Sequence, residues 1–165
     1  MTKSPITRFL LNDFIDEAYE ANDWTKVENA NVSNITDMSY LFDCVLNIKN
    51  LDLSSWDTSN VKDMSYMFSE SDFNSPLHFN TSNVKNMSGM FSSSEFNSPL
   101  HFDTSNVEDT EDIFANSPFN QDISDWVVQD NKNNQDVIEY REKCIIKRKV
   151  IEANINKNSS CGLKL

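Results

Sequence analysis

The stretch DTSNVKDMSYMF, residues 57–68, decides the fold because the chain repeats it. Residues 80–91 read NTSNVKNMSGMF and residues 103–114 read DTSNVEDTEDIF, each 23 positions after the copy before it. An earlier copy, NVSNITDMSYLF at residues 31–42, begins 26 positions before the copy at residues 57–68. A period of about 20 to 30 residues is typical of a solenoid, in which each repeat forms one coil and neighbouring coils bury a shared core. The sequence therefore predicts four stacked coils over residues 31–126.

Each copy carries apolar residues at a spacing that predicts a short helical turn. The spacing i, i+3, i+6 and i+7 puts four side chains on one side of such a turn. In the copy at residues 57–68 they are Val61, Met64, Met67 and Phe68. The segment PLHF at residues 76–79 instead alternates, with Leu77 and Phe79 inward and His78 outward, as a short strand does. One coil is therefore predicted to consist of a strand, a turn, a short helix and a second turn.

An asparagine recurs at one position of every copy: Asn34, Asn60, Asn83 and Asn106. In stacked coils equivalent residues lie above one another, and their amides can satisfy backbone groups at a corner. We therefore expect a structural ladder of asparagines at the corner that follows the strand. The neighbouring Thr, Ser and Asn residues also permit an ice-binding or sugar-binding array. The repeats are few and show no flat Thr-x-Thr face, so corner chemistry is the better interpretation.

Residues 1–30 precede the repeats and are predicted to form an N-terminal helical cap, because the terminal coils of a solenoid need covering. Ser4 is a suitable N-cap, with Pro5 at the first helical position. The apolar residues of this helix are expected to share one inward face: Ile6, Phe9, Leu10, Phe14 and Ala18.

The C-terminal part of the chain differs from the repeats in charge. Residues 1–136 carry 7 Lys and Arg against 23 Asp and Glu, a net charge of −16, whereas residues 137–165 carry 7 against 3, a net charge of +4. We predict a polar linker over 127–136, then a basic helix that ends near Asn154, then a disordered tail. The basic helix has three possible roles: contact with an anionic membrane, binding of a partner, or packing on the acidic last coil. Charge complementarity favours the last of these.

Composition excludes several classes of protein. With a net charge of −12, the acidic body repels phosphate backbones, so nucleic acid is not an expected partner for it. The chain shows neither a signal peptide nor a stretch of about 18 apolar residues. We therefore expect an unexported, cytoplasmic protein.

The residues that carry chemistry are few. Cys44, Cys144 and Cys161 show no C-x-x-C spacing and are odd in number, which argues against a disulfide framework or a zinc site. His78 and His101 occupy the same place in successive coils, where two imidazoles and a nearby aspartate suggest a metal site, but duplicated sequence explains an exposed pair equally well. The chain has only two glycines, too few for a glycine-rich phosphate-binding loop. We expect no catalytic residue, no metal and no cofactor.

The repeats resemble a known family. SSWDTSNVKDMSYMF, NTSNVKNMSGMF and FNQDISDW are similar to the signature of the BspA-like leucine-rich-repeat family, in its lipoprotein-associated branch. The resemblance covers residues 31–126. It implies a leucine-rich-repeat-like coil with a parallel sheet on one face, and a role in protein interaction or adhesion, often at a cell surface. It supplies no catalytic residues, and this chain lacks the export signal of the surface members.

Together these observations predict an α/β repeat fold: a right-handed, leucine-rich-repeat-like solenoid with short parallel strands and short helical turns, capped by a helix at each end. The predicted function is a non-enzymatic scaffold that binds a partner protein through the exposed sheet face. Its central residues should be those at outward strand positions: Asp52, His78, His101 and Ser124. The alternative is a surface adhesin that binds glycan or host-cell matrix.

Overall fold

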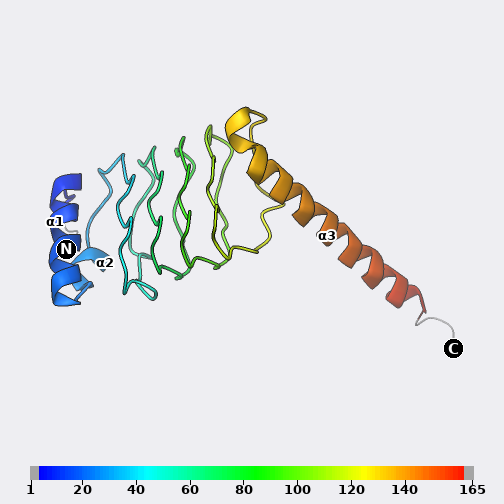
Figure 1. Ribbon diagram of the computed structural model, residues 1–165, viewed down its shortest axis with the longest axis horizontal. Coiled ribbons are helices and arrows are strands. Elements are labelled where there is room, and N and C mark those ends of the chain that lie inside the picture. Colours follow the sequence, from blue (N-terminus) through cyan, green and yellow to red (C-terminus); the bar gives the residue numbers. More distant parts are fainter. Residues whose placement is uncertain (1–3, 162–165) are drawn as a thin grey trace.

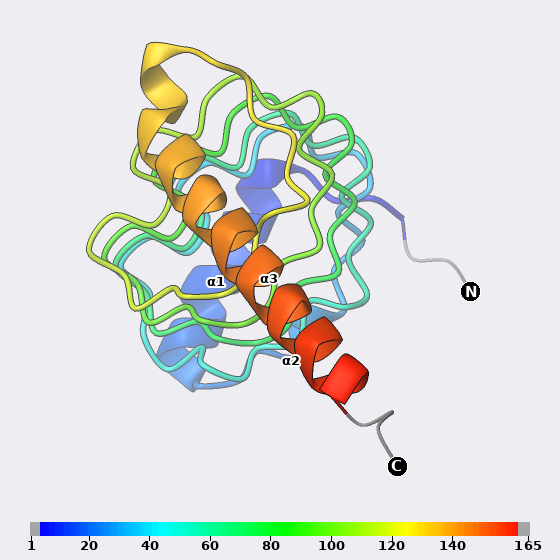
Figure 2. The ribbon, with the colours of Figure 1, turned by 90° about the vertical axis from the view of Figure 1, so that its right-hand side faces the viewer.

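The computed structural model describes residues 4–161, and their side chains as far as residue 151. The coils form a stack between two helical ends (Figure 1). Seen along the stack, the coils superimpose and the C-terminal helix crosses the last of them (Figure 2). The elements are α1 (Arg8–Ala21), α2 (Thr25–Glu28), the 3-10 helix η1 (Lys132–Asn134) and α3 (Gln135–Cys161).

The prediction of a leucine-rich-repeat-like solenoid with short parallel strands is wrong. Between residues 4 and 161 there is no strand, and successive coils are joined by three isolated parallel bridges: Asp37 with Asp63, Asp63 with Asn86, and Asn86 with Asp109. The segment 76–79 donates no backbone hydrogen bond to a neighbouring coil. It begins with a proline, which has no N–H to donate. The repeats stack, but they form no sheet and therefore no sheet face.

Most backbone hydrogen bonds between coils lie in the segment for which the spacing predicts a helical turn. Between the first two coils, every second residue of 38–44 donates its N–H to the next coil: Met38 to Asp63 at 2.8 Å, Tyr40 to Ser65 at 2.9 Å, Phe42 to Met67 at 2.8 Å and Cys44 to Ser69 at 2.9 Å. The pattern recurs at the next two junctions, as from Phe68 to Met90 and from Phe91 to Ile113, both at 2.9 Å. These bonds satisfy the backbone without regular secondary structure.

At two equivalent positions every coil has a left-handed backbone, which interrupts any strand or helix. The first column has φ of 56°, 54°, 60° and 56° at Tyr40, Tyr66, Gly89 and Asp112. The second has φ of 59°, 52°, 54° and 55° at Cys44, Glu70, Ser93 and Asn116. The predicted short helical turn is therefore wrong, because linked turns take its place.

Gly89 is the one glycine in these columns, and its neighbour explains it. The ring of Tyr66 stacks on that of Tyr40 with centroids 4.9 Å apart, and it lies where a β-carbon on Gly89 would be. The absence of a side chain on Gly89 thus makes room for Tyr66.

Two phenylalanine ladders run through the core of the stack. In the first ladder, Phe42, Phe68, Phe91 and Phe114 stack at centroid distances of 5.4, 5.8 and 6.0 Å. In the second, Phe73, Phe96 and Phe119 stack at 6.1 and 6.2 Å. In the last three coils a ring of one ladder stacks on a ring of the other, at 4.2, 4.1 and 3.9 Å. The four side chains predicted to point inward from residues 57–68 are all fully buried.

The N-terminal cap is a helix, but it begins later than predicted. Thr7, not Ser4, is the N-cap, and its side chain accepts a hydrogen bond from the N–H of Leu10 at 3.2 Å. Ile6 instead donates its N–H to the carbonyl of Asn31 at 2.9 Å, which holds the preceding residues along the first coil.

The buried face of α1 also differs from the predicted one. Leu11, Ile15 and Ala18 are its buried residues, at the helical spacing i, i+4, i+7. Phe9 is 75% exposed and Leu10 is 38% exposed. Apolar residues surround this helix on several sides, so the pattern alone did not identify the inward side.

The predicted polar linker at residues 127–136 packs on the last coil. Asn134, in η1, is fully buried. Its side-chain oxygen accepts hydrogen bonds from the backbone N–H of Thr110 at 2.9 Å and from the Thr110 hydroxyl at 2.8 Å. The segment thus continues the hydrogen bonding of the stack.

Helix α3 is longer than predicted and continues through Cys161, beyond Asn154. The segment 155–161, which we predicted to be disordered, is therefore helical. Residues 162–165 and the side chain of Cys161 lie outside the described part of the chain. Beyond the last coil, α3 projects away from the stack (Figure 1).

We expect Phe91→Ala to lower the free energy of unfolding by about 3–5 kcal/mol, because it interrupts the first ladder and leaves a cavity. The matched control is Phe9→Ala, which removes an exposed ring and should change stability by less than about 0.5 kcal/mol. Urea unfolding followed by circular dichroism measures both. Equal losses from the two substitutions would contradict the role of the ladder.

Gly89→Ala should destabilise the protein by about 2 kcal/mol, from the left-handed backbone and from contact with the Tyr66 ring. In a Tyr66→Ala background only the backbone penalty, about 1 kcal/mol, should remain. A double-mutant cycle by urea unfolding measures the coupling. Strict additivity would show that the ring does not require the glycine.

Candidate functional site

The structure places three of the four predicted partner-binding residues on the surface. Asp52, His78 and His101 are exposed, whereas Ser124 is only 8% exposed. The prediction that Ser124 points outward is therefore wrong. Two residues, Ser124 and Asp125, lie between the buried Ile123 and Trp126 in the sequence, whereas His101 alone lies between the buried Leu100 and Phe102. Of the two, Asp125 is the exposed residue in the last coil.

The histidine pair does not gather further ligands. Within the described residues no group of three or more His, Cys, Asp or Glu side chains is arranged to hold a metal ion. Of the described cysteines, Cys44 is exposed and Cys144 is buried, and both are free thiols.

The asparagine ladder bonds to backbone, and its amides are used within the stack. The Nδ2 groups of Asn60, Asn83 and Asn106 donate to carbonyls of the preceding coil, those of Ser33, Ser59 and Ser82, at 2.8, 2.7 and 2.8 Å. These contacts hold the corner of each coil to its neighbour. Asn34 occupies the same position in the first coil.

The carboxylates on the coils are also engaged locally. Asp57 and Asp103 each accept a hydrogen bond at 3.0 Å from the N–H two residues on, in Ser59 and Ser105. The side chain of the same serine is the largest cause that lowers the pKa of each carboxyl group, and this backbone N–H is the second. These two carboxylates thus shape the turns that they begin.

The junction between α3 and the last coil encloses a hollow of about 420 Å³. His101, Asp122, Asp125, Trp126 and Arg148 are among its lining residues. Arg148 forms ion pairs of 2.9 Å with both Asp122 and Asp125. This doubly paired guanidinium holds α3 over the coil.

Tyr140 and Arg148 both bind α3 to the last coil, Tyr140 at a partly buried position and Arg148 at a more exposed one. The Tyr140 hydroxyl donates to the carbonyl of Gln121 at 3.0 Å, and burial raises the pKa of Tyr140 to about 12. The pKa of Asp125 is lowered chiefly by its hydrogen bond with Arg148. The pKa of Asp122 is lowered chiefly by the backbone N–H of Ser124, with Arg148 a smaller cause.

The exposed apolar side chains gather at the two ends of the stack. Among the described residues, nine large apolar side chains are exposed, and α1 carries Phe9, Leu10 and Tyr19 while α3 carries Ile146, Val150 and Ile151. Sequence reasoning missed both groups, because it assigned Phe9 and Leu10 to the interior and treated α3 as a cap. For α1, the spacing i, i+4, i+7 of Leu11, Ile15 and Ala18 was the sequence pattern that could have identified the buried side and left Phe9 outside.

The coils and their helical ends define the class of the molecule, a repeat protein of stacked coils without strands. The chain belongs to a family described as "Mycoplasma protein of unknown function, DUF285", whose profile matches residues 11–126 and, in a second match, residues 49–147. No curated protein and no solved structure gives a significant match. Within residues 4–161, no helix is both long and apolar enough to cross a membrane.

In Arg148→Gln, the pKa of Asp125 should rise towards its ordinary value, whereas that of Asp122 should stay low because Ser124 still donates to it. Carbonyl NMR titration of the two carboxyl groups measures both, with Lys149→Gln as the control one residue away. Equal rises at both aspartates would contradict the assignment.

The pH dependence has a defined sign. A carboxylate whose pKa is lowered by folding stabilises the native state above its unfolded pKa, and that stability is lost as the pH falls through the folded pKa. In Arg148→Gln the free energy of unfolding should therefore fall less steeply as the pH is lowered, because the pKa of Asp125 is no longer lowered by Arg148.

Proposed function

We propose that the protein is a non-enzymatic interaction module that binds partner proteins through its helical ends. The observation that carries the proposal is the clustering of exposed apolar side chains on α1 and α3. Contiguous exposed apolar groups bordered by charge are typical of protein interaction sites.

The exposed half of α3 is the stronger of the two surfaces. Ile146 and Val150 are 61% and 54% exposed and lie one helical turn apart. Lys147 and Lys149 flank them, and both lysines are exposed. An apolar pair with a charged rim has the composition of a small interface core.

The environment of the coils supports a scaffold more than a catalyst. Several of their carboxylates and amides bond to the backbone of the same or adjacent coils, as the Asp57 and Asn83 contacts illustrate. Side chains engaged in this way maintain the shape of the stack. We therefore assign the coils the role of a rigid spacer between two binding surfaces.

The double substitution Ile146→Asp with Val150→Asp should reduce the capture of partner protein by at least about tenfold, because buried apolar contacts supply most of the energy of small interfaces. Affinity capture from native lysate with quantitative mass spectrometry measures the effect.

The matched control changes two exposed apolar residues elsewhere, Leu46→Asp with Val127→Asp, which are 49% and 57% exposed. Thermal melts should show that both variants fold. Capture that is unchanged by the α3 substitutions, or is lost equally in the control, would refute this surface.

A further inference from the structure

We infer that one partner of the α3 surface is a second copy of this chain, which presents its α1 surface, so that molecules associate head to tail. This inference rests on the proposed function, because it names a partner for the surface proposed there.

The outward side of α1 is apolar at one end and acidic along the rest. Phe9, Asp13, Asp16 and Glu20 follow the spacing i, i+4, i+7 and i+11, which places them on one side, opposite the buried Leu11, Ile15 and Ala18. We call these four residues the acidic end face.

The three carboxylates of the acidic end face have no ion-pair partner within the described part of the chain. Within the described residues, Asp13, Asp16 and Glu20 form no ion pair, whereas the adjacent Glu17 pairs with Lys26 at 2.5 Å. Phe9 adds a ring that is 75% exposed. The face therefore offers both negative charge and apolar area.

The exposed half of α3 has the complementary composition. Ile146 and Val150 are 61% and 54% exposed, and Lys147 and Lys149 flank them without an ion pair to any side chain of residues 4–151. We call these four residues the basic end face. The intervening Arg148 is already paired with Asp122 and Asp125, so it is not counted.

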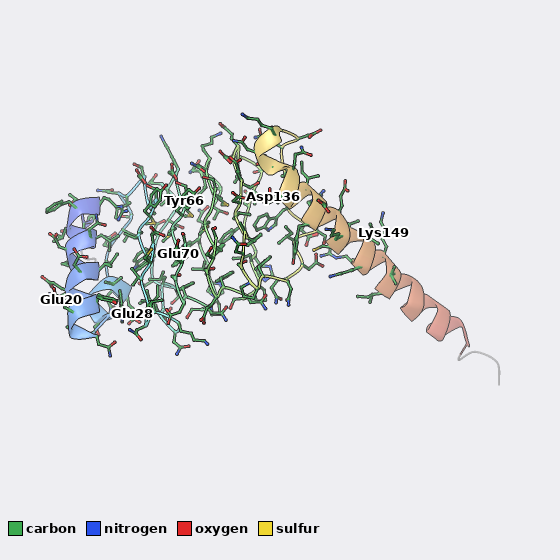
Figure 3. All side chains as sticks on the ribbon, viewed as in Figure 1. Glu20, Glu28, Tyr66, Glu70, Asp136 and Lys149 are labelled. Atoms are coloured by element: carbon green, nitrogen blue, oxygen red, sulfur yellow. The ribbon has the colours of Figure 1, made fainter. Side chains whose placement is uncertain are left out.

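The two faces lie at opposite ends of the molecule. In Figure 3, Glu20 is labelled at the α1 end and Lys149 on α3 beyond the last coil. The faces therefore cannot meet within one chain, and each is available to another copy.

The other acidic surface of the molecule is a poorer partner for the basic end face. Asp57 and Asp103 on the coils accept hydrogen bonds from their own turns, whereas no such bond is found for Asp13, Asp16 or Glu20 within the described residues. The apolar side chains at the α1 end also match those of α3. Opposite charge around a shared apolar centre favours contact between α3 and α1.

Different surfaces meet in this contact, so the interface is heterologous. A head-to-tail contact leaves one face open at each end and adds further copies unless the rotation closes a ring. Mass should therefore increase steadily with protein concentration and should decrease at high salt, because exposed charges are screened.

Charge reversal tests the inference. Lys147→Glu with Lys149→Glu makes the basic end face acidic, and Asp16→Lys with Glu20→Lys makes the acidic end face basic. Each variant alone should lower the association constant by at least about tenfold, because attractive pairs become repulsive. Sedimentation velocity over a concentration series at low and high salt measures association.

Mixing the two variants supplies the decisive comparison. The acidic α3 of one variant then meets the basic α1 of the other, so the equimolar mixture should regain association that neither variant shows alone. Lys62→Glu with Lys132→Glu is the matched control, since it changes the charge equally at two exposed lysines away from both faces. This control should associate as the natural sequence does.

Two outcomes would overturn the inference: a natural sequence that remains monomeric at low salt, or a mixture of the two variants that fails to regain association. A monomer that binds phosphatidylserine vesicles through α3 would identify a membrane as the occupant instead. A monomer that still captures another protein, and loses it on Ile146→Asp with Val150→Asp, would leave the proposed function intact.

Discussion

Stacking of phenylalanine rings between successive coils is the interaction on which the rest of the structure depends. A single coil has too little apolar area to fold alone, but each ring contacts equivalent rings in the coils beside it. Phe91 illustrates this, with Phe68, Phe96 and Phe114 as its neighbours. The 23-residue period keeps these rings in register, and the hydrogen bonds between coils form around them.

The same architecture determines where binding surfaces can occur. Coils bury their apolar residues against one another and use several polar side chains, such as Asp57 and Asn83, in hydrogen bonds at turns and corners. The ends differ, because a terminal coil has a neighbour on one side only. Helices α1 and α3 cover these ends, and each presents apolar and charged side chains outward. Function is therefore expected at the ends.

Sequence predicted the repeat, its period and its buried residues, because Val61, Met64, Met67 and Phe68 recur at equivalent positions. It did not predict the backbone path. The alternation at residues 76–79 suggests a strand, yet Pro76 has no N–H and residues 77–79 donate no backbone hydrogen bond to a neighbouring coil, whereas alternate residues of 64–70 do. Left-handed residues such as Tyr40 have no sequence signature, since only Gly89 in that column is a glycine. The outward position of Phe9 and the burial of Ser124 likewise depend on tertiary packing.

The pattern of hydrogen bonding between coils is the central claim, and amide hydrogen exchange measured by NMR tests it most directly. We predict strong protection at the N–H groups of Phe42, Phe68 and Phe91, which donate to the next coil. Those of Leu77 and His78 should exchange rapidly. Strong protection at residues 77–79, with rapid exchange at the three phenylalanines, would contradict the account and restore a sheet of parallel strands.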